Sequence, residues 1–212
     1  MNRKTGVIIV CSALTMLVCA QDIKLPEPKK TGGMPLMEAL AARQSQRTFS
    51  PKPLSNQQLA DLLWAAFGVN RADGKRTAPS ARNGQEVDIY VALPSGLYLY
   101  QAQSNTLEQI LSQDVRLQTG KAPFMKDVPV SLIFVADYDR MKGQTDFYSA
   151  TDTGYISQNV YLFCASAGLH TVVLGSVDKE ALQAAMKLKP SQHIILTQPV
   201  GFPPELTPVG SL

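Results

Sequence analysis

A β-hairpin in the first half of the chain places the strongest constraint on the fold. Residues from Glu86 to Leu93 follow the alternation of a strand, and the run GLYLY, from Gly96 to Tyr100, reads as a second strand. Only a Pro-Ser pair separates the two runs, and both residues are common in turns. Strands joined by so short a turn pair in antiparallel fashion, so the chain has to build an antiparallel pair into its sheet.

Other segments show the periodicity of helices and strands. Ser55 is a good N-cap for a helix whose apolar residues recur at i, i+3 and i+4 spacing as far as Phe67, and Gly68 ends that helix. The remaining predicted helices are Pro35 to Gln46, Thr106 to Ser112, Asp152 to Ala167 and Asp178 to Lys187, and the remaining predicted strands are Pro129 to Ala136, His170 to Leu174 and His193 to Val200. Strands and helices alternate in the second half, so the pattern predicts an α+β or mixed α/β fold with one sheet and helices packed on it.

The first twenty residues differ from the rest of the chain. A basic start precedes an almost wholly apolar stretch, and Val18-Cys19-Ala20 has the pattern of a signal peptidase site. We therefore expect residues 1–20 to be a signal peptide, residues 21–33 a tether, and residues 34–212 the folded domain of an exported protein, periplasmic or secreted. The apolar stretch is shorter than a membrane span requires. A lipid anchor at Cys19 is less favoured, because Val18 is larger than the usual residue before a lipidated cysteine.

Loss of this segment leaves a nearly neutral chain with one cysteine. The full sequence has 20 Lys and Arg against 17 Asp and Glu, and removal of Arg3 and Lys4 lowers the net charge from +3 to +1. Such a chain has no electrostatic footprint for nucleic acid. Cys11 and Cys19 are also removed, so no internal disulfide can form. Cys164 lies in an apolar helical pattern, and we expect it to be a small buried hydrophobic residue rather than a nucleophile.

The sequence lacks the signatures of several catalytic chemistries. It contains no glycine fingerprint for dinucleotides, no phosphate loop ending in Gly-Lys-Ser/Thr and no Gly-x-Ser-x-Gly elbow. His170 and His193 lie in or beside apolar strands, where a structural role is more common than a catalytic one, and a zinc site is not expected. No catalytic side chain or metal ligand is therefore predicted. Either the chain is not an enzyme, or a cofactor does the chemistry.

Three polar stretches could bind such a cofactor. RQSQRTF, from Arg43 to Phe49, places two arginines and a serine at the end of the first helix; they suit a phosphate, but cations there also simply stabilise a helix end. RTAPSARNGQ, from Arg76 to Gln85, offers Ser, Asn and Gln side chains in a loop that could also be an ordinary polar loop. From Ser157 to Ser176 a helix leads into a strand that ends at Gly175, where backbone N–H groups can approach a ligand closely. That stretch could equally be a plain helix–strand connection.

Together and in this order, the three stretches resemble the nitroreductase family of FMN-dependent oxidoreductases. The family's Arg-x-Ser-x-Arg/Lys element and the phenylalanine after it match Arg43 to Phe49, and its Pro-Ser-x-x-Asn-x-Gln loop matches Pro79 to Gln85. The family's helix pattern QN…L…A…GL matches Gln158 to Leu169, and its closing Gly-x-Pro matches Gly201 to Pro203. The resemblance spans Met34 to Pro203. Within the family, the GLYLY hairpin is similar to the branch with thiazole- and oxazole-forming peptide dehydrogenases.

The resemblance implies a fold, a cofactor and a partner. It implies a nitroreductase-like fold around a mostly antiparallel sheet, and a homodimer with FMN at the subunit interface. Arg43 and Ser45 would hold the phosphate, and Arg47 would approach the ribityl chain and the N1–O2 edge of the flavin. The other residues matched to the cofactor site are Gln44, where a second basic residue is common, Pro79, Ser80, Ala81 and Asn83 from the partner chain, Gln85 near them, and the backbone of Leu174 and Gly175 along the ring.

The resemblance also implies an activity. Family members transfer two electrons in a ping-pong cycle: NAD(P)H reduces FMN, the first product leaves, and an acceptor then takes the electrons. The expected substrate is a small flat organic molecule, such as a nitroaromatic, a quinone or an azoline-like compound. The alternative is a degenerate flavin-binding module without turnover. It is favoured by export away from NAD(P)H and by the tail after Pro203, which lacks the Lys or Arg that many family members carry there.

Overall fold

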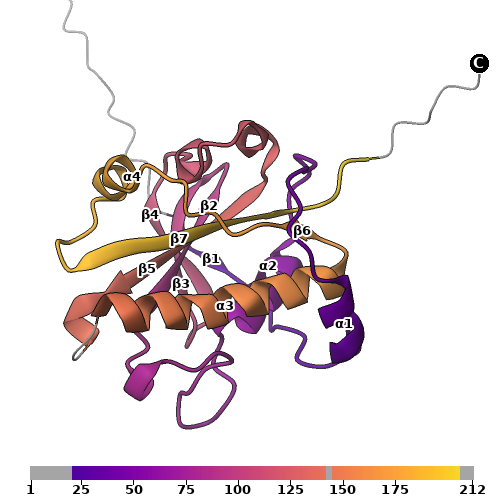
Figure 1. Ribbon diagram of the computed structural model, residues 1–212, viewed down its shortest axis with the longest axis horizontal. Helices are drawn as coiled ribbons and strands as arrows, with labels where there is room; N and C mark the ends of the chain where they lie inside the picture. Colours follow the sequence, from indigo (N-terminus) through magenta and orange to yellow (C-terminus); the bar gives the residue numbers. More distant parts are fainter. Residues whose placement is uncertain (1–20, 142–144, 206–212) are drawn as a thin grey trace, which may run out of the picture.

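The computed structural model describes residues 21–141 and 145–205, and a seven-stranded sheet lies at its centre (Figure 1). The strands are β1 (Ile23–Lys24), β2 (Val87–Leu93), β3 (Gly96–Gln101), β4 (Thr106–Leu111), β5 (Val130–Asp137), β6 (His170–Thr171) and β7 (Gln192–Gly201), in the order β1-β4-β3-β2-β5-β7-β6. All neighbouring strands run antiparallel. This single sheet confirms the predicted fold class. The predicted signal peptide, residues 1–20, and the last residues of the tail, 206–212, lie outside the described residues.

The predicted hairpin is present in the middle of the sheet. β2 pairs with β3, and Tyr90 lies opposite Leu99 and Leu93 opposite Gly96. The other edge of β2 pairs with β5, and β5 pairs in turn with β7. β2 and β5 are therefore interior strands, which explains why nearly all their residues are buried.

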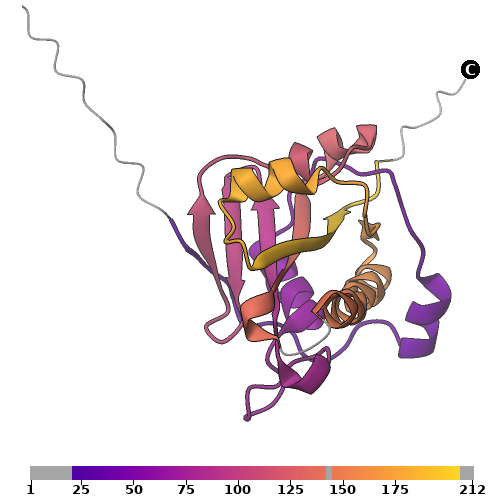
Figure 2. The same cartoon turned by 60° about the vertical axis from the view of Figure 1, so that its left-hand side comes forward.

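Helices cover both faces of the sheet (Figure 2). They are α1 (Leu36–Ala42), α2 (Asn56–Phe67), α3 (Thr145–Ala167) and α4 (Lys179–Met186), with short 3-10 helices η1 (Ala81–Asn83), η2 (Arg116–Thr119), η3 (Pro123–Asp127) and η4 (Tyr138–Arg140). Successive side chains of a strand point to opposite faces. Ile89 and Val91 of β2 therefore pack in one core cluster with α2 and α3, whereas Tyr90 and Ala92 pack in another with α4. The fold thus has three layers.

Helix α2 begins and ends as predicted. Ser55 is its N-cap and forms a capping box, because the Ser55 hydroxyl accepts a hydrogen bond from the Gln58 N–H and the Gln58 side chain accepts one from the Ser55 N–H. Gly68 is the C-cap, where a Cβ atom would collide with Trp64. The local signals at both ends therefore determined the bounds of this helix.

The prediction of a short helix from Thr106 to Ser112 is wrong, because this segment is strand β4. Leu107, Ile110 and Leu111 have helical spacing, yet β4 pairs with β3 and places Leu107 opposite Tyr100. This pairing satisfies the backbone and buries Leu107 in the core. Tertiary contacts therefore override the local periodicity.

Three elements differ from their predicted bounds by three residues or more at one end. α1 ends four residues earlier than predicted, α3 begins seven residues earlier, and β6 ends three residues earlier. α1 stops because the chain from Arg43 onward is extended, and the Gln46 N–H donates to the Thr171 carbonyl of β6 instead of to a helical partner. Beyond β6 the chain leaves the sheet. Its backbone pairs with β7 again at an isolated bridge between Leu174 and Thr197.

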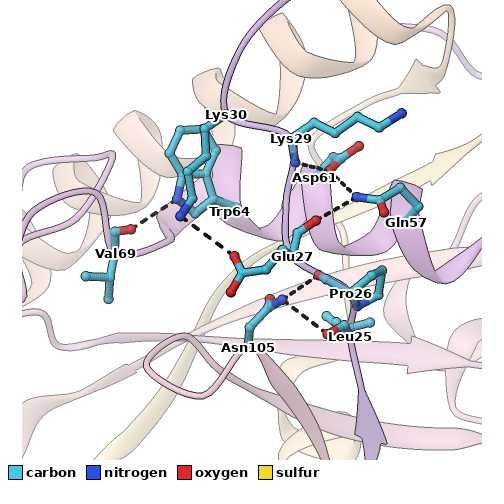
Figure 3. A network of polar contacts seen from close by, with 10 residues as sticks. All are labelled: Leu25, Pro26, Glu27, Lys29, Lys30, Gln57, Asp61, Trp64, Val69 and Asn105. Atoms are coloured by element: carbon cyan, nitrogen blue, oxygen red, sulfur yellow. Dashed lines mark hydrogen bonds and ion pairs between the residues drawn. The ribbon is translucent and has the colours of Figure 1, made fainter.

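The segment from Gln21 to Gly33, predicted as a tether, lies against the domain (Figure 3). Its strand β1 pairs with β4 at the edge of the sheet. Asn105 Nδ2 donates to the Pro26 carbonyl at 2.7 Å, and the Lys29 N–H donates to Asp61 of α2 at 2.7 Å. The segment thereby covers an edge that would otherwise expose unpaired backbone groups.

Candidate functional site

The first predicted stretch is an extended surface segment that follows α1. Arg43 is half-buried, and Gln44, Ser45 and Arg47 are exposed. Among residues 21–141 and 145–205, no carboxylate lies within ion-pair distance of Arg43 or Arg47. Gln44 and Gln46 line a hollow of about 210 Å³ beside the end of α3 and β6. The segment therefore offers two arginines that form no ion pair with the described residues, and a serine hydroxyl group beside them.

Tyr161 of α3 holds this segment in place. Its Oη lies 2.8 Å from Ser45 Oγ and accepts a hydrogen bond from the Val173 N–H at 2.9 Å. The Arg43 guanidinium lies over the Tyr161 ring, 5.4 Å from its centroid, as in a cation–π contact. One buried side chain thus sets the spacing between Arg43, Ser45 and the chain that follows β6.

Replacement of Tyr161 by Phe is expected to destabilise this connection. The half-buried Val173 N–H would lose its acceptor, and the loss of this hydrogen bond should lower the free energy of unfolding by about 0.5–1.5 kcal/mol. Urea unfolding measures this change. Tyr155→Phe, on the exposed side of the same helix, is the matched control and should unfold like the wild type. Equal stability of the two variants would show that the Tyr161 hydroxyl does not fix the segment.

The second predicted stretch forms a tight loop before β2. Arg82, Asn83 and Gln85 have positive φ angles of 53°, 55° and 46°. Non-glycine residues rarely adopt this left-handed region, and residues held in it cluster at functional sites. The loop is held by its own polar groups: Ser80 Oγ accepts from the Gln85 N–H at 2.9 Å, and Gln85 Oε1 accepts from Arg76 Nε at 2.8 Å. Its conformation is therefore built into the fold of the single chain.

The side chains of the loop divide into two groups. Gln85 Nε2 donates to the Gly74 carbonyl and to Asn83 Oδ1, each at 3.2 Å, so the Gln85 amide is engaged inside the loop. Pro79 and Asn83, by contrast, are exposed. Gln85 therefore supports the loop, while Pro79 and Asn83 present its outer surface.

Two buried acids anchor the loop to α3. The Ala81 N–H donates to Asp152 Oδ2 at 2.7 Å, and Asp152 is only 3% exposed. Glu86, which directly follows the loop, is completely buried, and neither of its carboxyl oxygens has a hydrogen-bond partner among the described residues. Burial, followed by the influence of the neighbouring Asp152 carboxyl group, raises the pKa of Glu86 to about 7.

The third predicted stretch places Leu174 and Gly175 beside the end of the sheet. The N–H and C=O groups of Leu174 are both bonded to Thr197, at 2.8 and 3.0 Å. No hydrogen bond within the described part of the chain engages the N–H of Gly175. A Cβ atom on Gly175 would meet only Leu196, at an ordinary 3.8 Å. Of the two residues, Gly175 has the backbone donor that is free for a ligand.

The predicted residues form two separate half-sites within one chain. Tyr161 anchors the cation half-site, which consists of Arg43, Gln44, Ser45, Arg47, Leu174 and Gly175. Asp152 anchors the loop half-site, which consists of Pro79, Ser80, Ala81, Asn83 and Gln85. Tyr161 and Asp152 lie nine residues apart on α3, which corresponds to about 13.5 Å along the helix axis. The two half-sites are therefore anchored at different turns of the same helix.

The two histidines and the cysteine have structural surroundings. His170 Nδ1 lies 2.7 Å from the Thr48 carbonyl oxygen, and the His193 ring stacks on Tyr138 at a centroid distance of 4.2 Å. Cys164 is 1% exposed, and burial raises the pKa of its thiol. It is thus the small buried residue that the sequence predicted. Among residues 21–141 and 145–205, no cluster of three or more His, Cys, Asp or Glu side chains could hold a metal ion.

Sequence reasoning missed Tyr161, Glu86 and Asp152. A tyrosine inside an apolar helical pattern signals that its hydroxyl needs a partner, but not which partner. Glu86 and Asp152 are far apart in sequence, and only the packing of α3 against the loop brings their carboxyl groups together. No local pattern could have found that pair.

Comparisons with known proteins agree with the fold. The sequence model described as "Nitroreductase family" matches residues 40–202. The curated relative "Putative nitroreductase MJ1384" of Methanocaldococcus jannaschii is 31% identical over 194 residues, covering 85% of this chain and 96% of the relative. The crystal structure of a "putative nitroreductase" from Ralstonia eutropha JMP134 is 43% identical with a TM-score of 0.83, covering 87% of this chain and 90% of that chain.

Fold, motifs and relatives together define an oxidoreductase of the kind that works through a bound flavin. The chain belongs to the nitroreductase family, which confirms the resemblance carried by the motifs at Arg43 and Pro79.

One more distant likeness concerns the fold alone. A chain in the structure of the E. coli microcin synthetase McbBCD complex with truncated pro-MccB17 bound is 15% identical, with a TM-score of 0.67, over 96% of this chain and 85% of that chain. Within the described residues, no helix combines the length and apolar character of a membrane span.

Proposed function

We propose that the mature chain is an exported FMN-dependent oxidoreductase that acts as a homodimer. It passes two electrons through the bound flavin in a ping-pong cycle, to or from a small flat organic molecule such as a nitroaromatic, a quinone or an azoline-like compound. NAD(P)H is one possible electron donor. The observation that carries the proposal is the cation half-site, in which Arg43, Ser45 and Arg47 lie in a fixed extended segment and have no carboxylate partner among residues 21–141 and 145–205.

The cation half-site fits the phosphate of FMN. A guanidinium group presents a planar fork of donors that matches a phosphate, and a serine hydroxyl adds one more donor. Arg43 keeps its charge available because it stacks on a ring instead of pairing with an acid. Ser45 is held at a fixed position by Tyr161. The donor set that a phosphate requires is therefore already arranged within the chain.

An exposed apolar surface supports the homodimer. Leu36 and Met37 of α1 are 63% and 75% exposed, and Phe147 and Tyr155 of α3 are 62% and 48% exposed. α1 packs beside α3, so both helices contribute to one side of the molecule (Figure 1). Exposed apolar side chains along two neighbouring helices suit an interaction surface, and a two-fold dimer uses the same surface on both chains. Such a dimer would let the loop half-site of each chain complete the cation half-site of its partner.

The residues of this chain would bind, orient and polarise the cofactor. Bound FMN supplies two-electron transfer between a donor and an acceptor. Arg43 and Ser45 would hold its phosphate, and the positive charge of Arg47 would favour uptake of electrons by the flavin. Pro79, Ser80, Ala81 and Asn83 come from the partner chain, with Gln85 supporting the loop. Because the cofactor transfers the electrons, the chain needs no catalytic side chain of its own.

A flavin-binding module without turnover is the second candidate. The sequence after Pro203 contains no Lys or Arg that could reach back to the phosphate. The predicted export would also separate the chain from NAD(P)H. Such a module would keep both half-sites and bind FMN but would not exchange electrons with an external donor.

Absorbance spectroscopy separates the two candidates. Purified mature protein, residues 21–212, should copurify with FMN or take it up and show the flavin band. We expect NADPH or dithionite to bleach the band and a nitroaromatic or a quinone to restore it. Bleaching without reoxidation by any acceptor would favour the module. A colourless protein that takes up no added FMN would contradict both candidates.

A further inference from the structure

Glu86 is a completely buried acid with no donor to neutralise it. Its relative exposure is 0%, and neither carboxyl oxygen accepts a hydrogen bond from any group in the described part of the chain. The nearest acid, Asp152 of α3, is also buried. An ionised carboxylate in such a place is strongly disfavoured unless a donor or a cation meets it. The simplest donor available to Glu86 is a proton held between the two carboxyl groups.

Both acids cannot be ionised together. Two carboxylates that share a buried site repel each other, so one of them retains its proton well above its ordinary titration range. The raised pKa of Glu86 follows this rule, because burial and the neighbouring Asp152 both favour the protonated form. Asp152 is the member that stays an acceptor, since its Oδ2 receives the Ala81 N–H.

Among residues 21–141 and 145–205, the charged groups near Glu86 have other partners or do not hydrogen-bond to its carboxyl group. Arg140 of η4 lowers the pKa of Glu86 only in part, because its Nη2 donates to the backbone carbonyl of Glu86 at 2.7 Å and to Asp88 of β2 at 2.6 Å. Its Nε also lies 3.9 Å from Asp137 of β5. Arg82 of η1 and Tyr148 of α3 line the same hollow of about 330 Å³, together with Glu86 and Arg140. Arg76 is hydrogen-bonded to Gln85.

The acid pair is connected directly to the loop half-site. Asp152 holds the Ala81 N–H at 2.7 Å, and the residues that follow Ala81 have left-handed backbone angles that require support. We propose that Glu86 and Asp152 share one proton, and that this acid pair keeps the loop from Pro79 to Gln85 in its flavin-binding conformation. The inference rests on the proposed function, because that function assigns the loop to FMN. Glu86 and Asp152 are positioning residues in this account.

The sign of the pH dependence follows from the raised pKa. When the loop opens, Glu86 meets water and titrates near its ordinary value of 4.5, whereas in the closed loop it titrates at about 7. The closed loop therefore holds one more proton between these values, and its stability falls as the pH rises through that range. Above about pH 7 the stability no longer depends on this group. From pH 5.0 to 7.5 the equilibrium constant for loop opening should rise about 50-fold.

Hydrogen exchange tests this on the flavin-free protein. We expect the protection factor of the Ala81 amide, corrected for intrinsic exchange, to fall about 50-fold from pH 5.0 to 7.5 in the wild type. Glu86→Gln keeps a neutral side chain that can still donate to Asp152, so its protection should not change with pH. Glu108→Gln, on the exposed side of β4, is the matched control and should behave like the wild type. If Glu86→Gln does not fold, Asp152→Asn serves instead. Its amide can accept from Ala81 and donate to Glu86, so the pH response should shrink.

FMN affinity at the same two pH values completes the test. Ionisation of the FMN phosphate between pH 5.0 and 7.5 affects the wild type and Glu86→Gln alike. Titration of flavin fluorescence should therefore show a lower ratio of the affinity at pH 7.5 to the affinity at pH 5.0 in the wild type than in Glu86→Gln. The same pH response in Glu86→Gln and the wild type would overturn the inference while leaving FMN binding intact. A wild type that binds no FMN at either pH would overturn the proposed function, and the exchange measurement would still decide whether the acid pair controls the loop.

Discussion

Arg43→Ala is expected to lose FMN while the protein stays folded. Removal of a charged hydrogen-bond donor to the phosphate costs about 1.5–3 kcal/mol, so the dissociation constant should rise about 10- to 150-fold. The fold should tolerate the change, because Arg43 forms no ion pair with any described carboxylate and its contact with the Tyr161 ring is worth only about 0.5–1 kcal/mol at an exposed site. Flavin content after purification and a titration with added FMN measure the loss.

Two further variants test whether the loss of FMN in Arg43→Ala comes from the missing guanidinium group. Arg43→Lys keeps the charge but not the planar fork, and its affinity should lie between those of the wild type and Arg43→Ala. Lys189→Ala removes an exposed cation beyond α4, on the opposite face of the sheet, and should keep full flavin content. If Arg43→Ala binds FMN as tightly as Lys189→Ala, the phosphate is not held by the cation half-site.

Gly96→Ala is expected to destabilise the fold strongly. Gly96 begins β3 with a φ of 144°, and a Cβ atom there would collide with the Leu111 carbonyl oxygen of β4. Backbone strain and overpacking together should lower the free energy of unfolding by about 2–5 kcal/mol. Urea unfolding measures this loss, which arises in the central hairpin and not in either half-site.

A second substitution in the same turn shows whether the glycine itself is required. Pro94 is exposed, and Pro94→Ala should change the free energy of unfolding by only about 0.4–1 kcal/mol, through the flexibility of the unfolded chain. If Gly96→Ala proves as stable as Pro94→Ala, the left-handed conformation of Gly96 is not what closes the hairpin.

The fold could be predicted wherever a local signal and the tertiary structure agree. The β2–β3 hairpin combines strand alternation with a turn, and α2 has a capping serine at one end and a glycine at the other. The segment from Thr106 to Ser112 has no such agreement, because its helical spacing conflicts with pairing to β3. The end of α1 was misplaced for a related reason. The residues after α1 are extended because Ser45 bonds to Tyr161 and Gln46 bonds to Thr171. Both partners are distant from α1 in sequence.

The site was predictable only in part. The motifs around Arg43 and Pro79 are continuous in sequence, so they could be identified as one candidate phosphate-binding stretch and one polar loop. Their supports are not continuous: Tyr161 and Asp152 both come from α3 and reach the two half-sites from different turns of that helix. The separation of the half-sites within one chain follows from those supports. It is also the reason why we propose that a second chain completes the site.

A mixed dimer tests that claim most directly. One chain carries Arg43→Ala, which breaks the cation half-site, and the other carries Asn83→Gly, which removes a loop side chain but keeps a residue that accepts positive φ. Each homodimer should lose FMN. In a mixed dimer, isolated through two different affinity tags, one of the two sites combines an intact cation half-site with an intact loop from the partner chain. The account therefore predicts about one FMN per mixed dimer. No FMN in the mixed dimer would show that each site is built within one chain and would contradict the account.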